Sequence, residues 1–276
     1  MRTDRLTPTL ARRRRIIEVV AFVAVWVAAG YVLPITSNGY LLLGIPLTIA
    51  FQLLVRRRPL RELFAFNTTR FALDGPGRVL AASLAVVPVI FAVRALSAGS
   101  WVDAGWYLAA TAGAVCAAFA LRNGSVRIAL RSAALPMAIG SVGMAAVYSG
   151  LHFATGTPIS ADAVVTAIVQ YSLLYFPATF LLEEVSFRGA LDAHVHHDGE
   201  RRGLMSAVLI AVLWGLWHLP VAKGLPFPIQ VGELVVVHVL LGVPLSLAWR
   251  RTRNLSGPAF AHAVNDAVRN AFMVGL

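Results

Sequence analysis

Apolar runs long enough to cross a lipid bilayer recur along the whole sequence, and they limit the folds that this chain can adopt. The hydrocarbon core of a bilayer is about 30 Å thick, which takes about 20 residues of helix. Of the 276 residues, 58% are hydrophobic and only 13% are charged, whereas a typical soluble domain has about 25% charged residues. Because backbone polar groups in lipid must bond within their own segment, we predict an all-α, polytopic transmembrane helical bundle.

Nine segments are candidates for the membrane spans, and we expect about eight or nine because the second segment is short. We expect a basic arm over residues 1–15, amino-terminal transmembrane helices over 16–162 and a transmembrane core over 163–276. Pro177 is expected to break or kink the sixth segment. The nine candidates are Ile16–Pro34, Tyr40–Val55, Val79–Leu96, Ala104–Leu121, Ala133–Leu151, Ala163–Leu182, Gly203–Leu219, Val231–Trp249 and Gly257–Val274.

The charge distribution predicts the orientation of the chain in the membrane. The net charge is +11, from 24 Lys and Arg against 13 Asp and Glu. In a soluble protein this excess would suggest a nucleic-acid partner, but in a membrane protein it follows from the positive-inside rule. With the amino terminus in the cytoplasm, 21 of the 24 basic residues fall in five cytoplasmic segments, namely 1–15, 56–78, 122–131, 188–202 and 250–253. We therefore expect membrane lipids as partners, no nucleic acid and a cytoplasmic amino terminus.

Two adjacent carboxylates interrupt the sixth apolar run, in the sequence Leu-Leu-Glu-Glu-Val-Ser-Phe-Arg-Gly-Ala-Leu at residues 181–191. Each charge at the centre of a bilayer costs roughly 2.5–3.5 kcal/mol on insertion scales. Glu184 and Arg188 are four residues apart and can pair on one helix face. Glu183 points about 100° away from Glu184. The pattern predicts one carboxylate held by arginine and one free for chemistry.

Two further helical segments in the last third of the chain carry polar groups. Trp214 and His218 are four residues apart, as are His262 and Asp266, with Asn265 directly before Asp266. Ionisable residues inside membrane segments mark functional sites more often than surface pairs do. We predict that these groups converge with the glutamate pair in one polar centre within the bundle.

Two kinds of chemistry fit such a centre. Glu183, His218 and His262 can hold Zn²⁺ with one position open for water. Alternatively, a glutamate activates water directly while the other polar groups stabilise an oxyanion. Asp266 can orient the imidazole of His262 or bind the metal itself. The residues alone leave both versions open.

Three motifs, in the order Glu-Glu-x-x-x-Arg, aromatic-x-x-x-His and His-x-x-x-Asn/Asp, resemble those of the CPBP family. That family comprises type II CAAX-prenyl endopeptidases and bacteriocin-processing or self-immunity proteins, described as intramembrane metalloproteases. The resemblance covers about Ala163 to Leu276 and implies a bacterial cytoplasmic membrane protein. Tryptophan stands at 214 where phenylalanine is commoner, and aspartate at 266 where asparagine is common. The resemblance implies Glu183, His218, His262 and Asp266 as catalytic residues, and Glu184, Arg188, Trp214 and Asn265 as structural or site-supporting residues.

Three functions are compatible with these features. The first is an intramembrane endopeptidase that cleaves a peptide or protein substrate, with or without a lipid modification, near the cytoplasmic face. The second is a non-enzymatic scaffold or bacteriocin immunity protein of the same fold. The third is a proton-coupled transporter, which the sequence disfavours because duplicated halves with paired broken helices are absent from it.

Other histidines of the chain receive a structural interpretation. His238 is expected to be a hydrogen-bonded packing residue of its helix. The cluster His194-x-His196-His197-Asp198 lies in a basic stretch between two spans, so we expect a solvated loop there.

Overall fold

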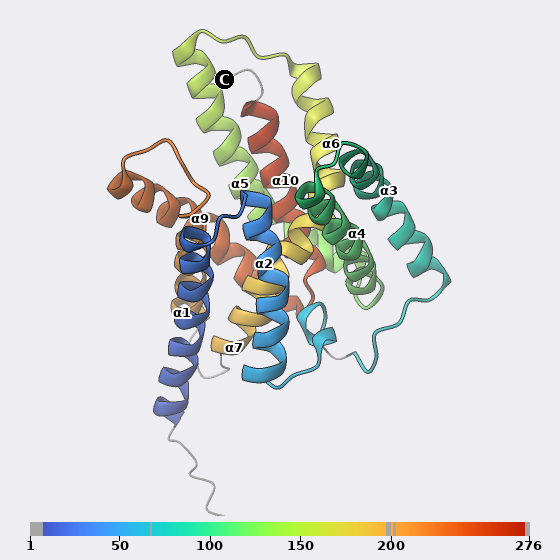
Figure 1. Cartoon of the computed structure of the whole chain (residues 1–276), viewed down its shortest axis with the longest axis vertical. Coiled ribbons are helices and arrows are strands. Elements are labelled where there is room, and N and C mark those ends of the chain that lie inside the picture. The colour runs from blue at the N-terminus through green and yellow to red at the C-terminus, as the bar shows by residue number, and fades with distance from the viewer. Residues whose placement is uncertain (1–7, 67, 197–199, 201–202, 274–276) are drawn as a thin grey trace, which may run out of the picture.

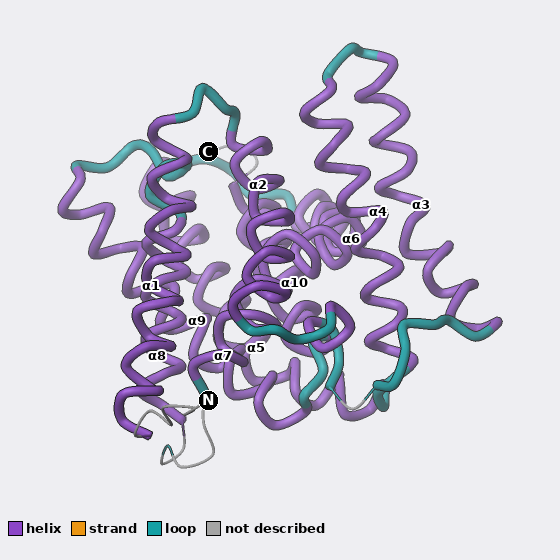
Figure 2. The backbone as a smooth tube through the Cα atoms, turned by 60° about the horizontal axis from the view of Figure 1, so that its bottom comes forward, coloured by secondary structure: helices purple, strands orange, loops and turns teal. Residues whose placement is uncertain are grey.

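The computed structural model describes residues 8–66, 68–196, 200 and 203–273, and the regular elements among them are all helices (Figures 1 and 2). The all-α prediction is confirmed. One isolated antiparallel bridge joins Ala65 to Asn254. The helices are α1 (Pro8–Val32), α2 (Ser37–Ala50) with η1 (Phe51–Val55), η2 (Leu60–Leu63), α3 (Gly75–Ser97), α4 (Trp101–Arg122), α5 (Val126–Thr155), α6 (Ala161–Thr179) with η3 (Phe180–Asp192) and α7 (Ala193–Val195), α8 (Leu204–Trp217), α9 (Phe227–Thr252) and α10 (Ser256–Met273).

Seven helices in the described part of the chain are long and apolar enough to cross a membrane. They correspond to the first six predicted spans and to the eighth. The other two predicted spans are also helical. The seventh is α8, whose 14 residues rise about 21 Å and so fall short of the bilayer core. The ninth is α10, which carries the polar residues His262, Asn265 and Asp266 among its 18 residues.

The structure corrects two expectations about helix boundaries. Within the described residues α1 extends from Pro8, so Arg12 to Arg15 are helical and precede the expected helix start at Ile16. Pro177 was expected to break or kink its helix, and of these the break is wrong, since helix continues from Ala161 to Val195. From Phe180 the segment has π-helical winding, and such local adjustments satisfy the backbone groups that a proline frees in membrane helices.

The π-helical segment η3 lies at the centre of the bundle. It contacts α2, α4, α6, α8 and α10, and in Figure 1 it passes behind α2. Gly189 allows the closest approach, because a Cβ atom at this position would lie 2.4 Å from the carbonyl oxygen of Leu63. Helix η2 therefore packs directly on η3. Small residues commonly permit such contacts between membrane helices.

A cluster of buried aromatic rings joins α1, α2, η3 and α8. The ring of Trp217 lies 4.9 Å from Trp26, 5.5 Å from Tyr40 and 5.4 Å from Phe187, measured between centroids. The hydroxyl of Tyr40 donates to the backbone oxygen of Trp217 at 2.8 Å. Aromatic pairs at these separations contribute about 0.5–1.5 kcal/mol each beyond their buried area. The cluster fixes the position of α8 beside η3.

A buried ion pair joins the end of η3 to the end of α9. Arg250 donates to both carboxylate oxygens of Asp192, whose side chain is fully buried. Arg250 also donates to the hydroxyl of Ser206 at 3.0 Å and to the backbone oxygen of Gly203. Bidentate arginine–carboxylate pairs give geometric specificity as well as energy. The pair therefore fixes α9 and the start of α8 relative to η3.

The exposed carboxylate of Asp74 caps α3 and links it to α4. It accepts hydrogen bonds from the backbone nitrogen of Gly77 and from Nε of Arg122, the latter at 3.0 Å. The hydrogen bonds from Arg122 lower the pKa of the Asp74 carboxyl.

Candidate active site

Glu184 and Arg188 form an ion pair in the interior of the bundle. Arg188 Nη1 donates to Glu184 Oε1 at 2.8 Å, and both side chains are fully buried. The guanidinium carbon of Arg188 lies 4.2 Å from the centre of the Trp214 ring, a cation–π arrangement. The pairing expected from the four-residue spacing is therefore present. The positive-inside argument counted Arg188 among the cytoplasmic loops, whereas the structure buries it.

Glu183 lies where three helices meet. Its Oε2 accepts a hydrogen bond from the indole nitrogen of Trp214 at 3.0 Å. The same oxygen lies 4.0 Å from His218 Nε2 and 3.9 Å from His262 Nε2. The structure thus brings together Glu183 of η3, His218 at the end of α8 and His262 of α10, as the sequence predicts.

His262 is held between carboxylates at both ring nitrogens. Nδ1 bonds Glu184 Oε1 at 2.8 Å, while Nε2 faces Glu183 and lies 3.4 Å from Asp266 Oδ2. Since an ionised carboxylate only accepts hydrogen bonds, Nδ1 carries a proton. Glu184 therefore has two partners, Arg188 and His262, and connects the buried ion pair to the imidazole.

His218 is oriented by the backbone of its own helix. Its Nδ1 donates to the carbonyl oxygen of Trp214 at 2.9 Å, which leaves Nε2 directed towards Glu183. The side chain of His218 is 22% exposed and that of Glu183 is 10% exposed. Both side chains therefore retain some accessible surface.

The residue types at this centre, two carboxylates and an imidazole, are ones that bind divalent metal ions. Ligand atoms of Glu183, His262 and Asp266 all lie within 4.8 Å of one another. Zn–N distances of 2.0–2.1 Å imply ligand atoms about 3.3 Å apart in a tetrahedral site. The pair His262–Asp266, at 3.4 Å, meets this spacing. The sequence had suggested Glu183, His218 and His262, but the compact group contains Asp266 in place of His218.

Asn265 points away from this centre. It accepts a hydrogen bond from Ser141 at 3.0 Å and donates to the carbonyl oxygen of Pro136 at 3.3 Å. A Cβ atom at Gly140 would lie 2.1 Å from Asn265 Nδ2. Asn265 thus joins α10 to α5, and its place in the structure is that of a packing residue of the helix that carries His262.

His238 and Arg269 lie beside the site, although neither was predicted from the sequence to be a site residue. The ring of His238 lies 4.4 Å from that of His218 and 4.5 Å from that of Trp214. Its Nδ1 donates to the carbonyl oxygen of Leu234, as expected of a packing residue. Arg269 Nη1 lies 3.3 Å from Asp266 Oδ1. The three-residue spacing to Asp266 is a signal that could have predicted this pair, whereas nothing in the sequence distinguished His238 from other membrane histidines.

The fold and the polar centre define an integral membrane protein with a buried carboxylate–histidine site. Residues 165–268 match the family model described as "Type II CAAX prenyl endopeptidase Rce1-like". This segment is less than half of the chain but contains every candidate catalytic residue, and through it the chain is similar to the CAAX-type proteases of the CPBP family. Comparison with curated proteins gave no match, and comparison with solved structures gave none either.

Proposed function

We propose that this protein is an intramembrane endopeptidase in which Glu183 activates the water that attacks a peptide bond. The observation that carries the proposal is the approach of two histidine Nε2 atoms, from separate helices, to within 4.0 Å of one Glu183 oxygen. Lone ionisable groups are costly in a membrane, so their convergence on one partly accessible point favours catalysis over a purely structural role.

The roles of the residues follow from their geometry. Glu183 takes a proton from water as the resulting hydroxide adds to the carbonyl carbon, and it then delivers that proton to the nitrogen that leaves as the peptide C–N bond breaks. His218, the more exposed of the two histidines, is placed to stabilise the oxyanion that forms. Glu184 holds Nδ1 of His262, which keeps Nε2 directed at the reacting centre.

A metal ion belongs to a second version of the proposal, in which Glu183 is a ligand and not the base. Glu183, His262 and Asp266 would hold Zn²⁺, with His218 directed at the same region. When bound, Zn²⁺ lowers the pKa of its water and polarises the substrate carbonyl. Nδ1 of His262 is occupied by Glu184 and Nδ1 of His218 by a backbone oxygen. Such partners orient the Nε2 lone pairs of metal-binding histidines.

The substrate and the orientation are also proposed. The description of the matching family model names a CAAX prenyl endopeptidase, which makes a peptide ending in a prenylated cysteine motif the first substrate to test. The positive-inside distribution supports an amino terminus and a cleavage reaction on the cytoplasmic side, and we propose that the membrane is bacterial.

Cleavage by the purified protein tests the proposal. Protein in lipid nanodiscs is given a fluorescent peptide that ends in a prenylated CAAX sequence, and the products are identified by mass spectrometry. Glu183→Gln should reduce the rate by about 10²–10⁴-fold. Glu233→Gln, at an exposed glutamate of α9, is the matched control and should leave the rate unchanged. Equal rates for wild type and Glu183→Gln would refute the catalytic role of Glu183.

A further inference from the structure

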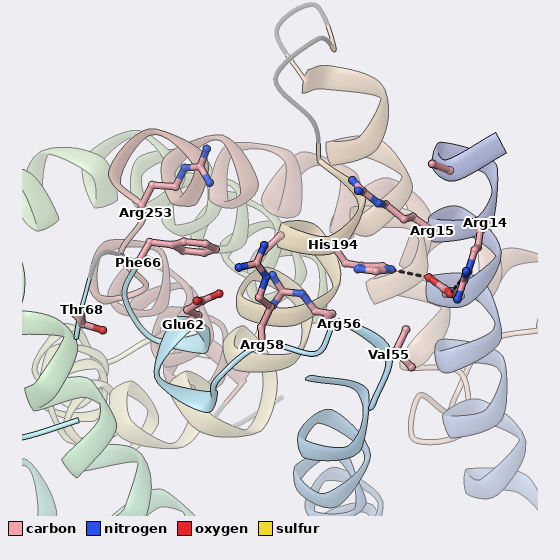
Figure 3. Close-up of a pocket in the computed structure, with 13 residues that line it drawn as sticks. Arg14, Arg15, Val55, Arg56, Arg58, Glu62, Phe66, Thr68, His194 and Arg253 are labelled. Atoms are coloured by element: carbon pink, nitrogen blue, oxygen red, sulfur yellow. Dashed lines mark hydrogen bonds and ion pairs between the residues drawn. The ribbon is translucent and has the colours of Figure 1, made fainter. Parts of the chain in front are cut away.

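A cavity of about 610 Å³ lies outside the candidate active site, where the ends of several helices meet. Figure 3 shows Arg14 and Arg15 reaching it from α1, Arg56 and Arg58 from the chain after η1, and Arg253 from the end of α9. We call it the basic cavity. Its five arginines come from three separate parts of the sequence, so the positive charges lie together only in the folded chain.

The charges that line the basic cavity do not balance. Five arginines face two carboxylates, Glu18 and Glu62, which leaves an excess of three positive charges. Glu18 is already occupied, since Arg14 and His194 each contact it at 2.8 Å. The exposed side chains of Arg15 and Arg58 make no hydrogen bond or ion pair with any residue that the structure describes. Their guanidinium groups remain available to an anion.

Other groups of the cavity are held in position. Arg56 Nη1 donates to Gln52 Oε1 at 2.6 Å and to the backbone oxygen of Gly189 at 2.8 Å. Arg253 lies over the ring of Phe66 at 5.4 Å. The positive-inside rule explains basic residues in loops, but it does not explain arginines oriented by specific bonds around one concave site.

Two arginines beside the cavity have left-handed backbone conformations, with φ of 54° at Arg57 and 53° at Arg253. This region costs a residue with a Cβ atom about 1 kcal/mol or more, and such positions gather at ligand-binding and active sites. Arg253 is the C-cap of α9, a position where glycine is the usual residue. An arginine there supplies a guanidinium group to the cavity wall that glycine would not.

We propose that the basic cavity binds the phosphate-bearing headgroup of an anionic membrane lipid. Planar guanidinium groups bind phosphate oxygens through paired hydrogen bonds, and basic pockets between membrane helices take anionic headgroups. A lipid is favoured over a soluble phosphate because Val55, which lines the cavity, continues into exposed Leu53 and Leu54, 45% and 72% accessible. Acyl chains can lie along this apolar surface while the headgroup occupies the cavity.

Native mass spectrometry of the full-length protein in neutral detergent tests the proposal. The probes are phosphatidylglycerol, zwitterionic phosphatidylcholine and soluble glycerol 3-phosphate. We expect one phosphatidylglycerol to bind in preference to the other two probes. The double variant Arg15→Gln/Arg58→Gln should weaken its binding about 10- to 30-fold, since each basic group near an anionic headgroup contributes about 1 kcal/mol.

Arg127→Gln/Arg131→Gln removes the same charge from exposed arginines of α5 that do not line the cavity, and it should change the affinity less than threefold. Equal losses in both double variants, or equal binding of phosphatidylcholine, would overturn the proposal. Binding of glycerol 3-phosphate as tight as that of the lipid would overturn the lipid assignment. Thermal unfolding without lipid checks the fold. If the double variant does not fold, Arg58→Gln alone should lower the affinity about fivefold, and an unchanged affinity would overturn the proposal.

Discussion

The indole nitrogen of Trp214 donates a hydrogen bond to Oε2 of Glu183 at 3.0 Å, and this is the oxygen that faces both catalytic histidine candidates. Phenylalanine, the commoner residue at this position of the motif, has no donor to offer. In this chain the aromatic residue of the second motif therefore acts on the glutamate of the first motif, in addition to packing beside it.

Replacing Trp214 by phenylalanine should keep the ring and remove the donor. Hydrogen bonds to charged groups contribute about 1.5–3 kcal/mol, so we expect cleavage to slow about 10- to 100-fold, measured as kcat/KM. Trp217→Phe is the matched control, because the buried Trp217 nitrogen bonds no residue among those described. If the two variants lose activity equally, the loss comes from aromatic packing and the hydrogen bond has no special role.

Glu184→Gln should affect stability more than Glu183→Gln does. Glu184 pairs with fully buried Arg188, and removing one partner of a buried ion pair costs about 3–5 kcal/mol. Glu183 has no arginine partner in the described structure, so Glu183→Gln should unfold near the wild-type temperature while losing cleavage. Thermal unfolding and peptide cleavage, measured on both variants, check this. The opposite pattern would show that the two carboxylates have exchanged roles.

Asp266→Asn separates the two versions of the chemistry. If Asp266 helps to hold a metal ion with Glu183 and His262, the substitution should weaken metal affinity by about 10–100-fold. Metal content by elemental analysis and affinity by competition with a chelating dye are the measurements, and neither requires an active enzyme. An active preparation that contains no stoichiometric metal and resists chelators would leave only the version in which glutamate and histidine act without metal.

Arg250→Ala should destabilise the bundle without touching the candidate active site. It leaves the buried carboxylate of Asp192 unpaired, at a cost of about 3–5 kcal/mol. Arg251→Ala, at the exposed neighbouring position, should change the free energy of unfolding by no more than about 0.5 kcal/mol. A similar unfolding temperature for both variants would contradict the importance assigned to the pair.

Local spacing predicted the parts of the site that lie on one helix. The Glu184–Arg188 pair was predicted from a separation of four residues alone. The nine helical segments were predicted from apolar length alone. The meeting of three helices followed from the cost of leaving separate polar groups in lipid. The particular atoms in contact did not follow, because the Trp214–Glu183 bond depends on how α8 packs on η3.

Other features depend on tertiary packing that no local pattern records. His238 reaches His218 because Gly215 lets α9 approach α8 closely, and a Cβ atom there would lie 2.6 Å from the oxygen of Leu234. The basic cavity likewise combines arginines from α1, from the chain after η1 and from α9. Pro177 was expected to break or kink its helix because proline does so in water-soluble helices. The helix does not break there, and its winding becomes π-helical from Phe180.

The π-helical winding of η3 affects how Glu183 and Glu184 are placed around His262. With hydrogen bonds from residue i to i+5, a π-helix has more residues per turn than an α-helix, so consecutive side chains diverge by a smaller angle. Glu183 and Glu184 can therefore both face the imidazole of His262, Glu183 near Nε2 and Glu184 at Nδ1. On a regular α-helix the same two carboxylates would diverge further. The winding of the backbone is thus a determinant of this centre in addition to the three motifs, and residues of η3 outside the motifs can contribute to it.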